Sequence, residues 1–70
     1  MEIIDARDKR KFAIISSFRE KGYKGVRYER KEKALREAKE HESAERDVIV
    51  YKLSNSPHDM LDFKYYVFYR

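Results

Sequence analysis

Apolar and polar positions along this chain of 70 residues repeat with two different spacings. A period of two, which is typical of strands, runs through four segments, and it predicts strands at residues 11–20, 26–30, 48–53 and 63–70. Gly22 and Gly25 lie between the first two segments, where a hairpin turn would join them as an antiparallel pair. Residues 1–7 leave two alternatives open: they add a strand to the sheet, or they lie loosely against it.

Between the second and third strand the spacing and the composition change. From residue 29 or 30 to about residue 45 the chain consists mainly of Ala, Leu, Glu, Lys and Arg, without Gly, Pro or β-branched residues. These are strong helix formers, and Ala34, Leu35 and Ala38 share one narrow apolar stripe. Acidic residues precede basic ones by four positions on the other sides, as in a solvated helix. The segment therefore predicts a helix that packs along a single face.

The predicted order is strand, strand, helix, strand, strand. It indicates one α+β domain over residues 1–70, in ββαββ order, with one helix packed on one face of a mainly antiparallel sheet. A single helix covers a single face. The other face of the sheet is therefore expected to be exposed.

The exposed face is predicted from alternation along the strands, and it mixes aliphatic, aromatic and basic side chains. A solvated face would instead be polar, and exposed apolar patches often mark contact sites. Tyr and Arg are also enriched among the residues that dominate binding energy. The residues that we expect to contact a partner on this face are Arg19, Arg27, Val50, Lys52, Lys64, Tyr66, Phe68 and Arg70.

Three occupants of this face stay open from the sequence. The first is a protein partner, which would make the chain an inhibitor, adaptor or accessory protein. The second is single-stranded nucleic acid or RNA, because aromatic rings stack on bases and basic side chains hold phosphates. The third is a second copy of the chain, or its own N-terminal segment.

Positive charge is concentrated in one part of the chain. The formal net charge is +4, yet residues 7–33 hold 11 Lys or Arg against 4 Asp or Glu. Arg7, Lys9, Arg10 and Lys11 form the densest run. Such a run either protects a strand edge from aggregation or attracts phosphates or an acidic protein surface.

The start of the predicted helix is also basic. Arg30, Lys31 and Lys33 oppose the helix dipole, and no Ser, Thr, Asn or Asp stands where an N-cap residue is expected. Either tertiary packing holds this helix end, or its free amides and basic side chains bind an anion.

Several function classes lack their sequence signatures. The chain has no cysteine and only two histidines, which argues against a structural metal, and its two glycines match no phosphate-binding loop. So small a core leaves little room for a water-excluding cleft, so we expect a non-enzymatic protein without a cofactor. No apolar run approaches the 20 or so residues of a membrane span, and an N-terminus with Glu2 and Asp5 is unlike a signal peptide. We therefore expect a cytoplasmic protein.

Overall fold

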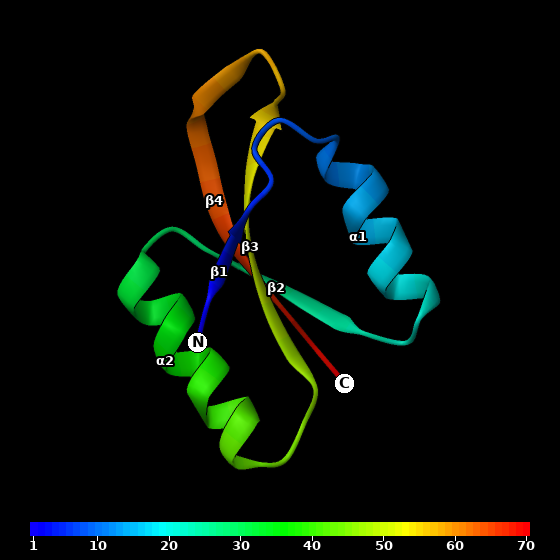
Figure 1. The fold of residues 1–70 in the computed structure, drawn as a ribbon, viewed down its shortest axis with the longest axis vertical. Coiled ribbons are helices and arrows are strands. Elements are labelled where there is room, and N and C mark those ends of the chain that lie inside the picture. Colours follow the sequence, from blue (N-terminus) through cyan, green and yellow to red (C-terminus); the bar gives the residue numbers. More distant parts are fainter.

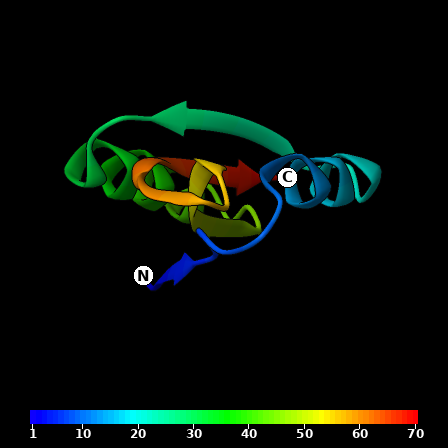
Figure 2. The ribbon, with the colours of Figure 1, turned by 90° about the horizontal axis from the view of Figure 1, so that it is seen from above.

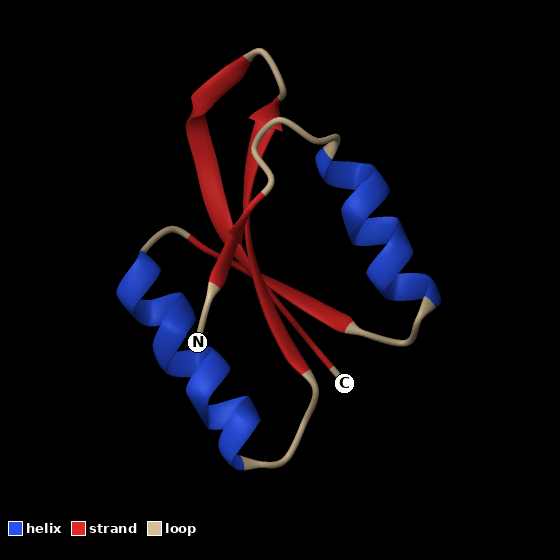
Figure 3. Ribbon diagram, in the orientation of Figure 1, coloured by secondary structure: helices blue, strands red, loops and turns tan.

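The computed structural model describes all 70 residues as a single α+β domain with two helices and four strands. The elements are β1 (Ile3–Asp5), α1 (Lys11–Glu20), β2 (Lys24–Tyr28), α2 (Lys31–Ser43), β3 (Val48–Ser56) and β4 (Asp59–Tyr69) (Figures 1 and 3). The predicted ββαββ order with one helix is therefore wrong, because the observed order is βαβαββ. Neither helix is long and apolar enough to cross a membrane.

The four strands form one mixed sheet in the order β1-β3-β4-β2. β4 is antiparallel to both of its neighbours, whereas β1 is parallel to β3. The connection through α1 crosses the sheet from one edge to the other, and the connection through α2 returns across it. Two crossovers of the same hand that run in opposite directions place their helices on opposite faces. Figure 2 shows this arrangement, with the stacked strands between α2 and α1.

Residues 11–20 form helix α1 rather than the predicted strand. Ile14, Ile15 and Phe18 share one side of this helix and pack on the sheet, with the spacing of a helix. Gly22 follows the helix with a φ of +87°, which glycine adopts without steric cost. The N–H of Tyr23 donates to the carbonyl of Phe18, and their rings meet edge to face at 5.0 Å. These features make a Schellman motif that ends α1, so Gly22 closes a helix instead of a hairpin.

The prediction of helix α2 is confirmed, with a start at Lys31 and an end at Ser43. Ala34 and Ala38 are completely buried against Val50 and Val67. Because both helical residues carry only a methyl group, the helix backbone can lie close to the sheet. The remaining faces of α2 are charged and exposed, as the sequence predicted.

The strand predictions for β2, β3 and β4 are confirmed with shifted ends, and residues 1–7 contain the additional strand β1. The sequence predicts that this strand pairs with residues 11–20, but in the structure β2 pairs with β4. β1 joins the sheet beside β3, with Ile3 opposite Val50. This parallel pair is a long-range contact, since no local turn can join two parallel strands.

The register between β3 and β4 determines which side chains share a face. Val50 lies opposite Val67, and Tyr51 lies opposite Tyr66. Tyr66 and Phe68 therefore point away from α2, as predicted, but they lie with Tyr51 beneath α1, whereas Val50, which was predicted to share their face, packs beneath α2. A register error of one residue inverts every assignment along a strand. The expected exposed face is thus absent, because α1 covers part of one face of the sheet and α2 covers part of the other.

Candidate docking surface

Three of the residues predicted to contact a partner are buried. Tyr66 and Phe68 are only 7% and 2% exposed in a cluster with Leu53, and Val50 is 0% exposed beneath α2. Their assignment to an exposed surface is wrong for two reasons. Helix α1, which was not predicted, covers Tyr66 and Phe68, and Val50 points to the face that α2 covers.

The predicted basic residues have partners within the chain. Lys52 Nζ lies 4.1 Å from the centroid of the Phe63 ring. Lys64 Nζ approaches Glu29 at 3.9 Å. Arg70 binds the Asp47 carboxylate at 3.3 Å, donates to the carbonyl of Lys21, and lies over the Tyr23 ring. These three basic side chains mainly join elements of the fold.

Arg19 and Arg27 do meet two of the other predicted residues. A small hollow of about 210 Å³ between α1 and β2 is lined by Arg19, Tyr66 and Phe68, together with Ile15, Tyr23 and Gly25. Arg27 is the register partner of Tyr66 on β2. The structure therefore brings three of the eight predicted contact residues together around a cavity and not on an open sheet, with Arg27 beside Tyr66 on the neighbouring strand.

The predicted anion site lies at the start of α2. Arg30 is the N-cap residue, in an extended conformation and without a side-chain cap, which confirms the missing cap. Lys31 and Lys33 follow in the first turn, both exposed, and Glu32 lies between them. Anion binding by Arg30, Lys31 and Lys33 stays a prediction.

Two grooves flank the N-terminal half of α1. One, of about 600 Å³, lies against β1 and Tyr51, and the other, of about 510 Å³, lies against the turn between β3 and β4. Arg10 and Ala13 line both grooves, so the two lie next to each other. We call this region the α1 surface, and its residues are Ile4, Asp5, Ala6, Lys9, Arg10, Lys11, Phe12, Ala13, Ile14, Tyr51, Asn55, Pro57 and His58.

Phe12 is the most exposed aromatic side chain of the protein. It is 73% exposed, and every other aromatic residue is buried or half-buried. Helical geometry accounts for this exposure, because Ile14, Ile15 and Phe18 face the sheet and residues 12, 13, 16 and 17 must face outward. Ala13 and two serines fill these outward positions, so α1 presents a weakly polar face beside the ring.

The α1 surface has a positive rim. The side chains of Lys9 and Arg10 are exposed and make no hydrogen bond or ion pair. Lys11 Nζ donates to the Asn55 side-chain oxygen at 2.8 Å and lies 4.9 Å from the Phe12 ring centroid. The surface therefore has two basic side chains without a partner, Lys9 and Arg10, and a third, Lys11, that Asn55 holds in place.

Arg7, the fourth residue of the basic run, has a structural role instead. Its guanidinium makes two 2.9 Å bonds to the Asp5 carboxylate and donates to the carbonyl of Met60. Hydrogen bonds from Arg7 lower the pKa of Asp5 below its ordinary value of 3.8. This pair fastens the segment after β1 to the hairpin, so only Lys9, Arg10 and Lys11 line the α1 surface.

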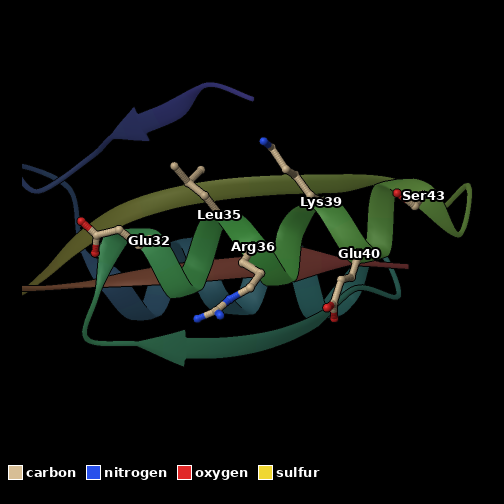
Figure 4. Close-up of a pocket in the computed structure, with 6 residues that line it drawn as sticks. All are labelled: Glu32, Leu35, Arg36, Lys39, Glu40 and Ser43. Carbon is tan, nitrogen blue, oxygen red and sulfur yellow. The ribbon is translucent and has the colours of Figure 1, made fainter.

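The outer side of α2 carries a further hollow, of about 560 Å³, which Figure 4 shows. All of its lining residues belong to this one helix, and only Leu35 among them is apolar. The others are Glu32, Arg36, Lys39, Glu40 and Ser43. Because no second element encloses it, this is a charged, solvated helix face.

Sequence reasoning missed the apolar part of the α1 surface. The sequence pattern places Phe12 and Ala13 in a strand and leaves two alternatives for Ile4, whereas it reveals the basic run beside them. The spacing of Ile14, Ile15 and Phe18, followed by Gly22, is the signal that could have revealed the helix.

The one histidine of the α1 surface, His58, lies on the β3–β4 turn, and no three His, Asp or Glu side chains come together anywhere in the chain to hold a metal ion. The chain matches no protein-family model, no curated protein and no solved structure.

Proposed function

We propose that this protein is a non-enzymatic binding protein, of the inhibitor, adaptor or accessory kind, that docks on a protein partner through the α1 surface. The observation that carries the proposal is the 73% exposure of Phe12, which lines the groove against the β3–β4 turn, next to the groove against β1. Burial of an exposed aromatic ring and of the mainly apolar groove beside it by a partner is favourable, because it removes apolar surface from water.

The chemistry of the surface indicates the chemistry of the partner. Lys9 and Arg10 border the apolar centre and have no acidic partner within the chain. A matching surface would present acidic side chains around an apolar depression that receives the Phe12 ring. Such an arrangement resembles other interfaces, in which an apolar core is surrounded by a polar rim.

Single-stranded nucleic acid is the second candidate. It is favoured by the density of positive charge, with 11 Lys or Arg against 4 Asp or Glu in residues 7–33. Phe12 could stack on one base while Lys9 and Arg10 hold phosphates. This candidate is the weaker one, because the other large apolar side chains that are well exposed are aliphatic: Met1, Ile4, Val26, Met60 and Leu61.

The experiment is affinity capture from a native lysate, with and without nuclease, using four forms of the protein. Phe12→Ala and Arg10→Glu should each lose the captured protein without a fall in melting temperature. Leu61→Ala is the matched control, since Leu61 is 88% exposed but lies outside the α1 surface. If Leu61→Ala loses the partner and Phe12→Ala retains it, the assignment of the surface is wrong.

Titration of a fluorescent oligonucleotide separates the two candidates. Binding to phosphates weakens steeply with salt, with a slope of about −0.7 per neutralised phosphate on single strands. The protein-docking proposal predicts no specific binding at moderate salt. Tight binding with a steep slope that Phe12→Ala removes would instead establish the nucleic-acid candidate.

A further inference from the structure

Strand β2 forms an open edge of the sheet and has five residues. It pairs with β4 on one side only, and Lys24, Gly25, Val26 and Arg27 are all exposed. The other edge is β1, which has only three residues. No proline interrupts β2, and its register with β4 is continuous over five residue pairs. Unpaired backbone N–H and C=O groups at such an edge are ready to pair with another strand.

We propose that β2 pairs antiparallel with β2 of a second copy, with Val26 opposite Val26. The two sheets of four strands would then form one continuous sheet around a two-fold axis. This inference concerns a different surface from the α1 surface and does not depend on the proposed function.

Symmetry restricts the register. Opposite residues of an antiparallel pair point to the same face, so the two-fold axis must be perpendicular to the sheet and must pass beside one residue of β2. An axis at Arg27 would place two arginines opposite each other, and an axis at Gly25 would leave Tyr28 unpaired. An axis at Val26 uses all five residues of the strand.

The charges of β2 are compatible with the register at Val26. Lys24 of each copy then faces Tyr28 of the other, and Arg27 faces Gly25. No like charges lie directly opposite, which would destabilise the pair. The valines meet at the centre, on the face of the sheet that α2 covers, where Val26 is now 38% exposed.

Charges on α2 are complementary under the same axis. Arg36 and Glu40 extend from α2 toward β2, whereas Leu35 and Lys39 extend toward β1 (Figure 4). A two-fold axis at the middle of β2 reverses the order of Arg36 and Glu40 in the second copy. The positive end of each pair therefore faces the negative end of the other. This self-complementarity favours a second copy over an unrelated extended peptide as the occupant of the edge.

The absence of cysteine makes the register directly testable, because an introduced cysteine has no competitor. In a dimer centred at Val26, Val26→Cys places two thiols on directly opposite residues, within the Cα separation of about 4.4 to 6.8 Å that a disulfide needs. Lys24→Cys places the two thiols about 13 Å apart along the strands, beyond that reach. Mild oxidation should therefore crosslink Val26→Cys quickly and leave Lys24→Cys uncrosslinked. Equal crosslinking of both variants, or of neither, would overturn the register.

Light scattering of the wild-type protein provides the mass. We expect twice the 8.6 kDa of one chain at micromolar concentration. Val26→Glu should yield a folded monomer, since it places two carboxylates opposite each other, while Val26→Thr keeps the dimer. A wild-type protein that stays at the mass of one chain at high micromolar concentration contradicts the proposal.

A charge exchange on α2 tests the choice of a second copy. Glu40→Arg alone should weaken dimerisation about three- to tenfold, and the double variant Arg36→Glu with Glu40→Arg should restore it. A double variant no better than the single one would show that this edge does not pair with itself as proposed. Phe12→Ala should remain dimeric, so failure of the docking proposal would be seen separately.

Discussion

The ring of Phe68 lies directly over Gly25, its register partner on β2. A Cβ atom at position 25 would come within 2.9 Å of the Phe68 ring carbon Cε1. The ring cannot move away easily, because it is 2% exposed and stacks on Phe18 with centroids 4.5 Å apart. Glycine at position 25 therefore permits a close approach between the edge strand and an aromatic layer beneath α1.

Gly25→Ala should destabilise the protein by about 1 to 3 kcal/mol, because it overpacks this layer. Urea denaturation measures the effect. Lys24→Ala is the matched control on the same strand and should change the free energy of unfolding by less than about 0.5 kcal/mol. In the background of Phe68→Leu the alanine should cost clearly less, since the smaller side chain leaves room. Additive effects of the two substitutions would contradict the proposed contact.

The ion pair of Asp5 and Arg7 should make stability depend on pH in the acid range. Hydrogen bonds from Arg7 lower the pKa of Asp5 in the folded protein below 3.8, its ordinary value. The unfolded chain therefore binds this proton more readily than the folded one. The stabilisation is present above pH 3.8 and is lost as the pH falls below it.

Asp5→Asn should consequently melt at a lower temperature than wild type at pH 7, and the difference should shrink below pH 3.8. Asp8→Asn serves as the control, since the exposed Asp8 side chain makes no hydrogen bond or ion pair. A gap between Asp5→Asn and wild type that stays constant from pH 7 to pH 2 would show that the carboxylate acts only through its shape.

The sequence predicts α2 well and α1 poorly, for a physical reason. α2 has neither Gly nor β-branched residues, so propensity and pattern agree. In α1, Phe12, Ile14 and Phe18 also fit a period of two, and the two isoleucines favour strands. Tertiary packing of Ile15 with Phe18 and the Schellman motif at Gly22 decide the competition in favour of a helix.

A second Schellman motif ends α2 without glycine. Glu45 has a φ of +61°, the N–H of Glu45 donates to Glu42, and that of Arg46 donates to His41. A side chain in the left-handed conformation costs about 1 kcal/mol. Glu45→Gly should therefore raise the free energy of unfolding by up to about 1 kcal/mol. Glu42→Gly, three residues earlier in the helix, should lower it by a similar amount. Thermal melts of both variants check the opposite signs.

The prediction of the site failed with the prediction of α1. Once residues 11–20 were assigned to the sheet, a face remained without a helix, and Tyr66 and Phe68 were placed in solvent. The alternation predicted along β4 is correct. Alternation within one strand does not specify, however, which residues of β3 share a face with Tyr66 and Phe68. That choice depends on the pairing of Tyr51 with Tyr66, a long-range contact that no local pattern encodes. The basic run from Arg7 to Lys11 is recognised from the sequence because the charge of a residue does not depend on how the strands pair.

Both helices begin after an arginine that cannot cap them. Arg10 and Arg30 are the N-cap residues of α1 and α2, both are extended, and neither makes a side-chain cap bond. Aspartate in this backbone conformation would accept a hydrogen bond from the first turn and would also favour the helix dipole. Arg10→Asp and Arg30→Asp should each stabilise the free protein by about 1 kcal/mol, which raises the melting temperature by about 4 to 8 °C for a domain of this size.

The two substitutions should differ in their effect on binding. Arg10 lines both grooves of the α1 surface, so Arg10→Asp should weaken capture of an acidic partner while it stabilises the protein. Arg30 lies outside that surface, so Arg30→Asp should leave capture unchanged. If only the substitution at position 10 raises the melting temperature and weakens capture, arginine at this position contributes to partner binding and destabilises the helix. If Arg30→Asp instead reduces capture and Arg10→Asp does not, the partner binds the basic start of α2, where Lys31 and Lys33 are exposed.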